Sequence, residues 1–435
     1  MFMQQINVGI IGFGTVGAGT VEALINNRET ISSRVGSEIV IKRIADLDLD
    51  SDRGISLLPG ILIKDADAII NDPEIHIVVE LIGGLKKAKE FILAALKNGK
   101  HVVTANKALL AEYGSEIYRT AEENRVSIGF EASVGGAIPV IRSIKEGLSA
   151  NNIKTIMGIV NGTSNYILTR MTQDSLPYDQ AVEGAVRLGY AEDPPTLDVD
   201  GTDAAHKLAI LISVAFGVPV PFKSIYREGI DRLTPDDINF ARDFGYNLKL
   251  LAIARNKEGK IEARVHPTMV PRNHIMANVN EAYNAIYVEG DFSGPSLYYG
   301  LGAGRRPTGS AVASDIISMA RQMNSGAVTL MPPLAHARVR SNISMQGIEE
   351  LNTPYYFRFS AVDKPGVLSK ISGVLGENNI SISSVIQKGR GEKGAVPIVM
   401  LTHEAKEKNV TRALNELAGS DILMDSTMMI RVEQG

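Results

Sequence analysis

The sequence predicts an α/β protein that begins with a parallel β-sheet covered by helices on both faces and ends in smaller α+β parts. Over the first 140 or so residues, short apolar strands alternate with helices, which is typical of a buried parallel sheet. The pattern changes after about residue 143, and strand–helix–strand order returns over the last 80 or so residues. A chain of 435 residues also exceeds one ordinary hydrophobic core, so we expect several domains.

The N-terminal domain, which we place at residues 1–140, is predicted from its apolar periodicity. The expected strands are residues 6–11, 39–45, 75–80, 101–104 and 126–130. The expected helices are residues 16–26, 86–98 and 113–124. A later helix rich in small residues, most evident over 309–322, is expected to return to this domain as residues 304–325.

The rest of the chain is expected to form an α+β second domain over residues 141–303, a linker over 326–350 and a third domain over 351–435. In the second domain the expected strands are 154–160, 260–270 and 285–289, and the expected helices are 166–172, 178–188, 201–216 and 235–246. Pro332 and Pro333 favour an irregular linker. The third domain should hold strands at 355–362, 380–387 and 395–402 around a helix at 367–378.

The composition is typical of a globular protein and excludes several functions. The chain is 44% hydrophobic and 22% charged, and its formal net charge of −4 gives no electrostatic reason to expect nucleic acid or a membrane as partner. The absence of cysteine excludes disulfides, thiolate metal sites and thiol nucleophiles. The longest apolar run, residues 208–222, is interrupted by glycine and proline and is shorter than the roughly 20 residues of a membrane span. We expect a cytoplasmic protein without a zinc site.

A glycine pattern near the N-terminus predicts a dinucleotide-binding Rossmann domain. Gly12, Gly14 and Gly17 form G-x-G-x-x-G between an apolar strand and a helix. In this pattern the glycines permit a tight turn, close approach of a pyrophosphate, and packing of helix on strand. The helix N-terminus offers N–H groups to the phosphates. The candidate cofactor loop is Gly12, Phe13, Gly14, Thr15, Val16 and Gly17. A plain glycine-rich turn is the alternative.

Asp46 is the candidate ligand for the cofactor ribose, because it follows the second expected strand. An acidic residue at this position favours NAD. Arg43 and Arg53 are near in sequence and are candidates to accept the 2′-phosphate of NADP. The choice between NAD and NADP is therefore open, and a turn residue is the competing interpretation of Asp46.

Two further segments carry candidate catalytic residues. Lys107 follows the expected strand at 101–104, and the carboxyl ends of strands in a doubly wound sheet face the ligand crevice. Asp203 and Lys207 are four residues apart, so they share one face of the expected helix. Carboxylates would hold an ammonium group, and a lysine would donate a proton to a nascent alkoxide. An exposed ion pair on a helix is the competing interpretation.

Three motifs together resemble the homoserine dehydrogenase family. They are Asn106-Lys107-Ala108-Leu109, the run NGTSNYIL at 161–168, and LGYAEDP at 188–194 continuing through Asp203 and Lys207. The likeness extends from the glycine loop to about residue 321, which is about three quarters of the chain. It implies reversible reduction of L-aspartate 4-semialdehyde to L-homoserine with NAD or NADP as cofactor, in the biosynthesis of threonine, methionine and isoleucine.

The resemblance also implies roles for particular residues. Lys107 and Lys207 match the two lysines of the family, of which the residue matching Lys207 is usually assigned as the proton donor. Glu192 and Asp203 match substrate-binding acids, and Asp198 falls at another acidic position of that pocket. We expect the two lysines to lie near one substrate oxygen, with Lys107 also near the cofactor.

Further positions of the family concern the cofactor and a cation. Gly189 and Gly304 match positions near the cofactor. Members also bind a monovalent cation, commonly sodium, in a loop after the last Rossmann strand, largely through backbone carbonyls. The matching residues are Glu131, Val134, Gly136 and Ile138.

The C-terminal segment resembles an ACT domain, a small ferredoxin-like βαββαβ module that binds amino acids. The turn Asp363-Lys364-Pro365-Gly366-Val367-Leu368 between a strand and a helix carries this likeness over about 75 residues. It implies threonine as feedback inhibitor, and the alternative is a module that only mediates assembly. ACT domains commonly pair, so we expect a homo-oligomer, a dimer or a tetramer.

Two other interpretations remain open at the level of the sequence. One is a different amino-acid dehydrogenase on the same scaffold, which the combination of Lys107, Glu192, Asp203 and Lys207 disfavours. The other is a non-catalytic sensor of dinucleotide and amino acid, which would not need both lysines and the acidic pocket.

Overall fold

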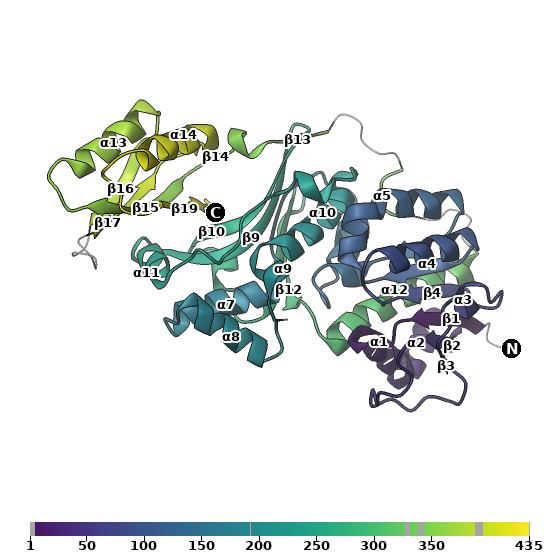
Figure 1. The fold of residues 1–435 in the computed structure, drawn as a ribbon. Coiled ribbons are helices and arrows are strands. Elements are labelled where there is room, and N and C mark those ends of the chain that lie inside the picture. The colour runs from purple at the N-terminus through teal and green to yellow at the C-terminus, as the bar shows by residue number, and fades with distance from the viewer. Residues whose placement is uncertain (1–4, 192, 327–330, 338–342, 388–394, 435) are drawn as a thin grey trace. The chain divides into compact units, whose positions relative to one another are not determined.

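The computed structural model describes residues 5–191, 193–326, 331–337, 343–387 and 395–434 (Figure 1). The chain forms two compact units. The first comprises Met1–Gly162, Asp203–Ile225 and Ala282–Ile343. The second comprises Thr163–Thr202, Tyr226–Glu281 and Ser344–Gly435. Within the described residues, every helix is too short or too polar to cross a membrane.

A six-stranded sheet begins the first unit. Its strands are β1 (Gln5–Ile11), β2 (Glu38–Ala45), β3 (Leu62–Ile63), β4 (Ile77–Glu80), β5 (His101–Thr104) and β6 (Ile128–Gly129). They lie in the order β3-β2-β1-β4-β5-β6, and every neighbouring pair is parallel. This is the strand order of the Rossmann fold, with its switch point between β1 and β4. The predicted parallel sheet is confirmed, although β4 and β6 are shorter than expected.

Helices cover this sheet. They are α1 (Thr15–Asn26), α2 (Arg28–Val35), α3 (Asp67–Ile70), α4 (Lys86–Lys97) and α5 (Lys107–Glu123). The predicted start of α5 at residue 113 was wrong, because the helix begins at Lys107. The Asn106 side chain caps it there by accepting a hydrogen bond from the Leu109 N–H at 3.1 Å. The cap therefore places Lys107 in the first turn of a helix.

A helix from late in the chain returns to this domain, as expected. α12 (Arg305–Ser325) packs against α1 through glycine on both sides. A Cβ added to Gly309 would lie 2.4 Å from the backbone of Gly19, and one added to Gly19 would lie 1.9 Å from the carbonyl oxygen of Arg305. Only glycine permits so close a contact between the two helix backbones.

The first unit also contains an antiparallel set of strands and one long buried helix. β7 (Ile153–Ile159), β11 (Tyr283–Gly290) and β12 (Gly294–Leu301) pair in the order β12-β11-β7. β7, β11 and α10 (Thr202–Phe216) were predicted within one or two residues. β12 was not predicted, because it is an edge strand of partly exposed residues and contains no apolar run.

The second unit contains a helical part and a long hairpin. Its elements before the C-terminal module are α7 (Gly162–Gln173), α8 (Tyr178–Arg187), α9 (Thr196–Val199), β8 (Tyr226–Arg227), α11 (Pro235–Asp243), β9 (Tyr246–Lys257) and β10 (Lys260–Pro271). β9 and β10 pair antiparallel along their whole lengths. β9 was missed, because the predicted helix was extended to residue 246, across the turn at Gly245 that precedes the strand.

The C-terminal module has the βαββαβ order of an ACT domain. Its elements are β15 (Tyr355–Val362), α13 (Val367–Glu377), β16 (Ile382–Gln387), β17 (Ala395–Thr402), α14 (Glu407–Ala418) and β19 (Met428–Val432). The strands lie antiparallel in the order β19-β15-β17-β16, as in ferredoxin-like folds. Aromatic side chains of β15, namely Tyr355, Phe357 and Phe359, are buried against both helices.

Part of the expected linker is regular structure. β13 (Ser344–Gln346) pairs parallel with the start of β10. Just after the expected linker, β14 (Asn352–Thr353) pairs with β18 (Ala405–Lys406). β19 also pairs parallel with the end of β10, Thr268 opposite Arg431. The ACT sheet therefore continues into the β9–β10 hairpin of the same unit.

Candidate active site

The glycine loop between β1 and α1 is tightly packed at two of its three glycines. Gly12 has φ of +104°, and a Cβ there would lie 2.6 Å from the Leu81 backbone. A Cβ on Gly17 would lie 2.1 Å from the Gly12 carbonyl oxygen, whereas one on Gly14 would meet no atom within 4 Å. Gly14 precedes α1 and no side chain caps the helix there, so the helix N-terminus is open to a phosphate.

Asp46, directly after β2, is bound to this loop. One carboxylate oxygen accepts a hydrogen bond from the Phe13 N–H, and the other accepts one from the Asp48 N–H at 2.9 Å. The guanidinium of Arg53 lies over the Phe13 ring, 5.1 Å from its centroid. The end of β2, the glycine loop and Arg53 thus form one connected surface.

A cavity lies at the carboxyl ends of β4 and β5, beside the start of α1. It is lined by Val16, Glu80, Leu81, Gly83, Ala105, Asn106, Lys107 and Ala108. The fully buried Glu80 accepts hydrogen bonds from the Thr104 hydroxyl at 2.7 Å and the Ile82 N–H at 3.0 Å. The Thr104 hydroxyl in turn accepts one from the Asn106 N–H at 3.0 Å. Burial raises the pKa of Glu80. Sequence reasoning missed Glu80, since a polar residue ending an apolar strand gives a weak signal.

Two lysines share one carboxylate in the first unit. Lys107 Nζ lies 2.8 Å from one oxygen of Asp203, and Lys207 Nζ lies 2.6 Å from the other. Lys207 also donates to the Val160 carbonyl at 2.6 Å, and the Asn161 side-chain amide donates to Asp203 at 2.9 Å. Asp203 and Lys207 are buried, whereas the Lys107 side chain is 43% exposed. The exposed ion pair considered as an alternative is therefore wrong for Asp203 and Lys207.

The environment of Asp203 keeps its carboxyl ionised. Burial alone would raise the pKa of this group, but the charges and hydrogen bonds of Lys207 and Lys107 outweigh burial and hold the pKa below its ordinary value. Asp203 is therefore a permanent hydrogen-bond acceptor near neutral pH and has no proton to give.

Two helix N-termini meet at this cluster. Lys107 is the first residue of α5, and Asp203 is the second residue of α10. The helix dipole disfavours a cation in a first turn and favours an anion there. The pairing with Asp203 offsets the unfavourable position of Lys107. Asn161 stands in a motif of the resemblance without an assigned role, and its contact with Asp203 could not be predicted, because Val160 and Asn161 directly follow β7 and are distant in sequence from α10.

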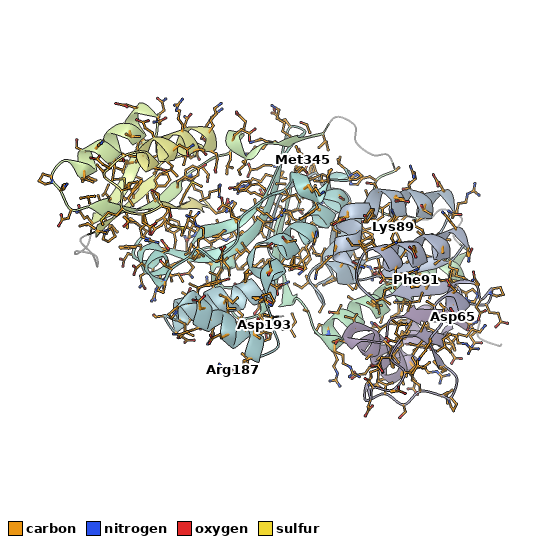
Figure 2. All side chains as sticks on the ribbon, viewed as in Figure 1. Asp65, Lys89, Phe91, Arg187, Asp193 and Met345 are labelled. Atoms are coloured by element: carbon orange, nitrogen blue, oxygen red, sulfur yellow. The ribbon has the colours of Figure 1, made fainter. Side chains whose placement is uncertain are left out.

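The other expected substrate and cofactor residues are distributed as follows. Gly304 precedes α12 in the first unit with φ of +122°. Gly189, with φ of +74°, follows α8 in the second unit, and Asp198 lies on α9 of that unit. Figure 2 labels Arg187, the last residue of α8, and Asp193, which precedes α9. Glu192 lies outside the described residues.

The loop after β6 holds the expected cation ligands. The Glu131 carboxylate accepts hydrogen bonds from the Ile141 and Arg142 N–H groups, both at 2.8 Å, so it caps the following helix. Burial, with a smaller contribution from the charge of Asp315, raises the pKa of Glu131 to about 7. Gly136 has φ of +56°. Among the described residues, three or more His, Cys, Asp or Glu never gather as they would around a metal ion.

The strand-to-helix turn of the C-terminal module has the geometry expected of an ACT domain. Gly366 has φ of +88° and directly precedes α13. A residue with a side chain would be strained at this position. The turn therefore depends on the glycine in Asp363-Lys364-Pro365-Gly366.

A Rossmann sheet with an open glycine loop, a lysine–carboxylate cluster beside it and an ACT module define an NAD(P)-dependent oxidoreductase. Family comparisons agree with this class. A homoserine dehydrogenase family profile matches residues 139–317, the NAD-binding domain of homoserine dehydrogenase matches 12–131, and the ACT domain matches 355–419.

Whole-chain comparisons make the assignment specific. The chain is 43% identical to homoserine dehydrogenase of Neisseria gonorrhoeae, over 99% of both chains. It is 44% identical to that of Pseudomonas aeruginosa, over 99% of this chain and all of the relative. A solved homoserine dehydrogenase from Thiobacillus denitrificans superposes with a TM-score of 0.94 at 44% identity, covering 100% of this chain and 99% of that one. The chain belongs to the homoserine dehydrogenase family and acts as an NAD(P)-dependent oxidoreductase on a CH–OH group.

Proposed function

We propose that the chain catalyses the reversible reduction of L-aspartate 4-semialdehyde to L-homoserine through Lys107, Asp203 and Lys207. The observation that carries the proposal is the Asp203 carboxylate held between the two ammonium groups. Lys107 also lines the cavity beside the glycine loop. Lys107 follows the carboxyl end of β5, the end of a dinucleotide-binding sheet at which ligands bind, and Asp203 links it to Lys207.

The proton that the alkoxide takes must come from a lysine of this cluster. The nicotinamide, when bound, supplies or accepts the hydride. Asp203 stays ionised and orients both lysines instead of acting as an acid. We assign proton donation to Lys207, which is fixed by Asp203 and the Val160 carbonyl, and orientation of the substrate to the more exposed Lys107.

The substrate is a small zwitterion, so its ammonium group needs carboxylates. We assign this role to Glu192 and Asp198, with Asp203 as the acid closest to the reacting oxygen. Charge-assisted hydrogen bonds of this kind are stronger than neutral ones and discriminate against substrates that lack the amine. Replacement of Asp198 by asparagine should therefore raise KM for L-homoserine more than it lowers kcat.

The cofactor contacts follow from the glycine loop. Open N–H groups at the start of α1 suit the pyrophosphate, and the Asp46 carboxylate suits the ribose hydroxyls. The residues that we propose to contact the cofactor are Gly12, Phe13, Gly14, Thr15, Val16, Gly17, Asp46, Lys107, Gly189 and Gly304.

A steady-state assay tests the activity. Purified protein is mixed with L-homoserine and NAD or NADP, and nicotinamide absorbance is followed. Reduction of either cofactor supports the proposal. Folded protein that binds dinucleotide and reduces neither would contradict it.

We also propose a monovalent cation, sodium, in the loop after β6. The donors are backbone carbonyl oxygens of Glu131, Val134, Gly136 and Ile138, which suit a hard cation. The Glu131 carboxylate is occupied in capping, so backbone carbonyls are the donors that we propose, and the Ile138 carbonyl also accepts a hydrogen bond from the Val140 N–H at 2.8 Å. Activity in sodium chloride and in choline chloride at equal ionic strength should differ.

Regulation and assembly are the remaining proposals. We assign threonine as inhibitor at the ACT module, and a dimer or tetramer as the assembly. Turnover measured with and without threonine tests the first, and light scattering tests the second.

We also propose the domain division predicted from the sequence. It consists of residues 1–140 with 304–325, residues 141–303, and residues 351–435 after a linker at 326–350. Limited proteolysis would test it. The cytoplasmic location stays a prediction.

A further inference from the structure

We propose that this chain prefers NAD to NADP because Asp46 and Asp48 already neutralise Arg53, the cation expected to read a 2′-phosphate. The inference rests on the proposed cofactor site at the glycine loop and names which dinucleotide that site takes. It depends on hydrogen bonds and ion pairs within the first unit.

Arg53 is committed to the loop that it stabilises. Its Nε donates to the Phe13 carbonyl at 2.8 Å, and its two terminal nitrogens donate to the Ser51 carbonyl at 2.6 Å and the Asp48 carbonyl at 2.8 Å. The side chain is only 13% exposed. Three of the five N–H donors of the guanidinium are used by these carbonyls, and the terminal nitrogen bound to the Asp48 carbonyl also lies 3.2 Å from an oxygen of the Asp48 carboxylate. A phosphate held by both terminal nitrogens would therefore compete with Asp48.

Two carboxylates flank the same guanidinium. Arg53 lies 3.2 Å from a carboxylate oxygen of Asp48 and 3.8 Å from one of Asp46. Hydrogen bonds from Ser51 and the Asp50 N–H lower the pKa of Asp48 to about 2, with a smaller contribution from Arg53. Asp48 is therefore charged at every physiological pH, and Arg53 presents no net positive charge to a ligand.

Asp46 is placed to meet the ribose itself. Its carboxylate is held by the Phe13 N–H of the glycine loop and by the Asp48 N–H. A ribose 2′-hydroxyl is a hydrogen-bond donor that a carboxylate accepts. A 2′-phosphate carries a charge of about −1.5 to −2 near neutral pH and has only acceptor oxygens. The same carboxylate therefore attracts NAD and repels NADP.

The other nearby cations do not change this balance. Arg43 lies on β2 and its guanidinium donates to the Lys42 carbonyl at 3.3 Å. Lys64 is exposed and follows β3, beside the Asp46 N–H that donates to the Ile63 carbonyl. Lys64 carries a point charge and lacks the planar fork that holds a phosphate bidentately. It is the residue to vary if NADP binds better than expected.

Binding of each oxidised dinucleotide to the full-length protein, measured by calorimetry without substrate, tests the inference. We expect NAD to bind at least about tenfold more tightly than NADP, a difference of about 1.4 kcal/mol. Asp46→Asn should weaken NAD binding about tenfold. It should also reduce the ratio of the dissociation constants for NADP and NAD, because a neutral amide no longer repels the phosphate. Asp50→Asn, an exposed neighbour in the same loop, is the matched control and should leave the ratio within about twofold.

Wild-type protein that binds NADP as tightly as NAD, or more tightly, would overturn the inference while leaving the dehydrogenase assignment intact. Loss of that NADP affinity in Lys64→Ala would then show that Lys64 reads the phosphate. Folded protein that binds neither dinucleotide would instead remove the cofactor site on which the inference rests. An unchanged ratio in Asp46→Asn would show that Asp46 does not discriminate.

Discussion

Asp203 lies one helical turn before Lys207 on α10, and its carboxylate oxygen is 2.6 Å from the Lys207 ammonium nitrogen. This pair is buried and is completed by Lys107, the first residue of α5 in the Rossmann domain. The arrangement assigns hydrogen-bond acceptance and proton donation to different residues. Asp203 remains an acceptor, and the lysines keep the protons that a reduction of an aldehyde requires.

Replacement of Lys207 by alanine should lower kcat for L-homoserine oxidation by a factor of about 10²–10⁴, the usual contribution of a positioned acid or base. Dissociation constants for the dinucleotide should change little, because the glycine loop is untouched. Lys87→Ala, which removes an exposed lysine paired with Glu90, is the control and should keep full activity. Equal kcat in Lys207→Ala and wild-type protein would exclude Lys207 as the proton donor.

Asp203→Asn should destabilise the protein by about 3–5 kcal/mol at neutral pH, because it leaves two lysines without their shared counter-charge. The folded pKa of Asp203 is depressed below its unfolded value near 3.8. Its contribution to stability is therefore present above that value and is lost as pH falls through the depressed folded pKa. Melting temperatures of variant and wild type should converge in strong acid. A difference between the two melting temperatures that stays constant down to pH 2 would contradict this account.

The glycines of the cofactor loop should separate folding from binding. Gly17→Ala places a Cβ 2.1 Å from the Gly12 carbonyl, so it should lower the melting temperature and abolish dinucleotide binding together. Gly14→Ala meets no protein atom within 4 Å and should keep the melting temperature. It should still weaken dinucleotide binding, because its methyl group occupies the approach of the pyrophosphate. Tight binding by Gly14→Ala would place the pyrophosphate elsewhere.

Glu80→Gln should lower kcat about tenfold by loosening the hydrogen bonds through Thr104 and Asn106 that fix the start of α5 and Lys107. Its effect on stability has a defined pH dependence. Burial raises the folded pKa above the ordinary value of 4.5, so the wild type loses stability as pH rises from there through the raised pKa. Glutamine cannot ionise, so the stability of the variant relative to the wild type should increase as pH rises from 4.5 through the raised pKa. Parallel pH profiles of the two melting temperatures would contradict the prediction.

Arg358 on β15 and the fully buried Asp237 on α11 join the ACT module to the rest of the second unit. The guanidinium donates to both carboxylate oxygens, at 2.7 and 3.0 Å. Arg358→Ala leaves Asp237 buried without this partner and should cost about 3–5 kcal/mol. If threonine acts at the ACT module, inhibition should also weaken while uninhibited turnover persists. Chemical denaturation and inhibition curves measure the two effects, and Lys370→Ala, an exposed pair with Asp421, is the control.

Sequence periodicity predicted the elements that stand out as apolar runs between turns. β1, β2 and β5 were placed within one residue. β1 and β5 are mostly buried and apolar, as expected of central strands of a parallel sheet, whereas β2 is only partly buried and carries Lys42 and Arg43. β9 and β12 were missed for different reasons. β9 is apolar, and the predicted helix was extended to residue 246 across Gly245, which has φ of +87° and marks the turn before the strand. β12 is a half-exposed edge. The start of α5 was missed because the cap by Asn106 was not recognised as a helix signal.

The site could be predicted only where residues share one element. Asp203 and Lys207 were linked by their spacing of four residues on one helix. Lys107 was assigned to the same site by resemblance, and no spacing could show that its ammonium group and that of Lys207 contact one carboxylate. Asn161, Val160 and Glu80 contribute through contacts between distant segments, which neither composition nor periodicity records.

The most direct test of the central claim is L-homoserine oxidation by wild-type protein and by Lys207→Ala, each with NAD, together with the dissociation constant for NAD in both. The account predicts turnover by the wild type, loss of turnover by a factor of about 10² or more in the variant, and equal affinities for NAD. Turnover that survives in Lys207→Ala, or a wild type that binds NAD and does not oxidise L-homoserine, would contradict it.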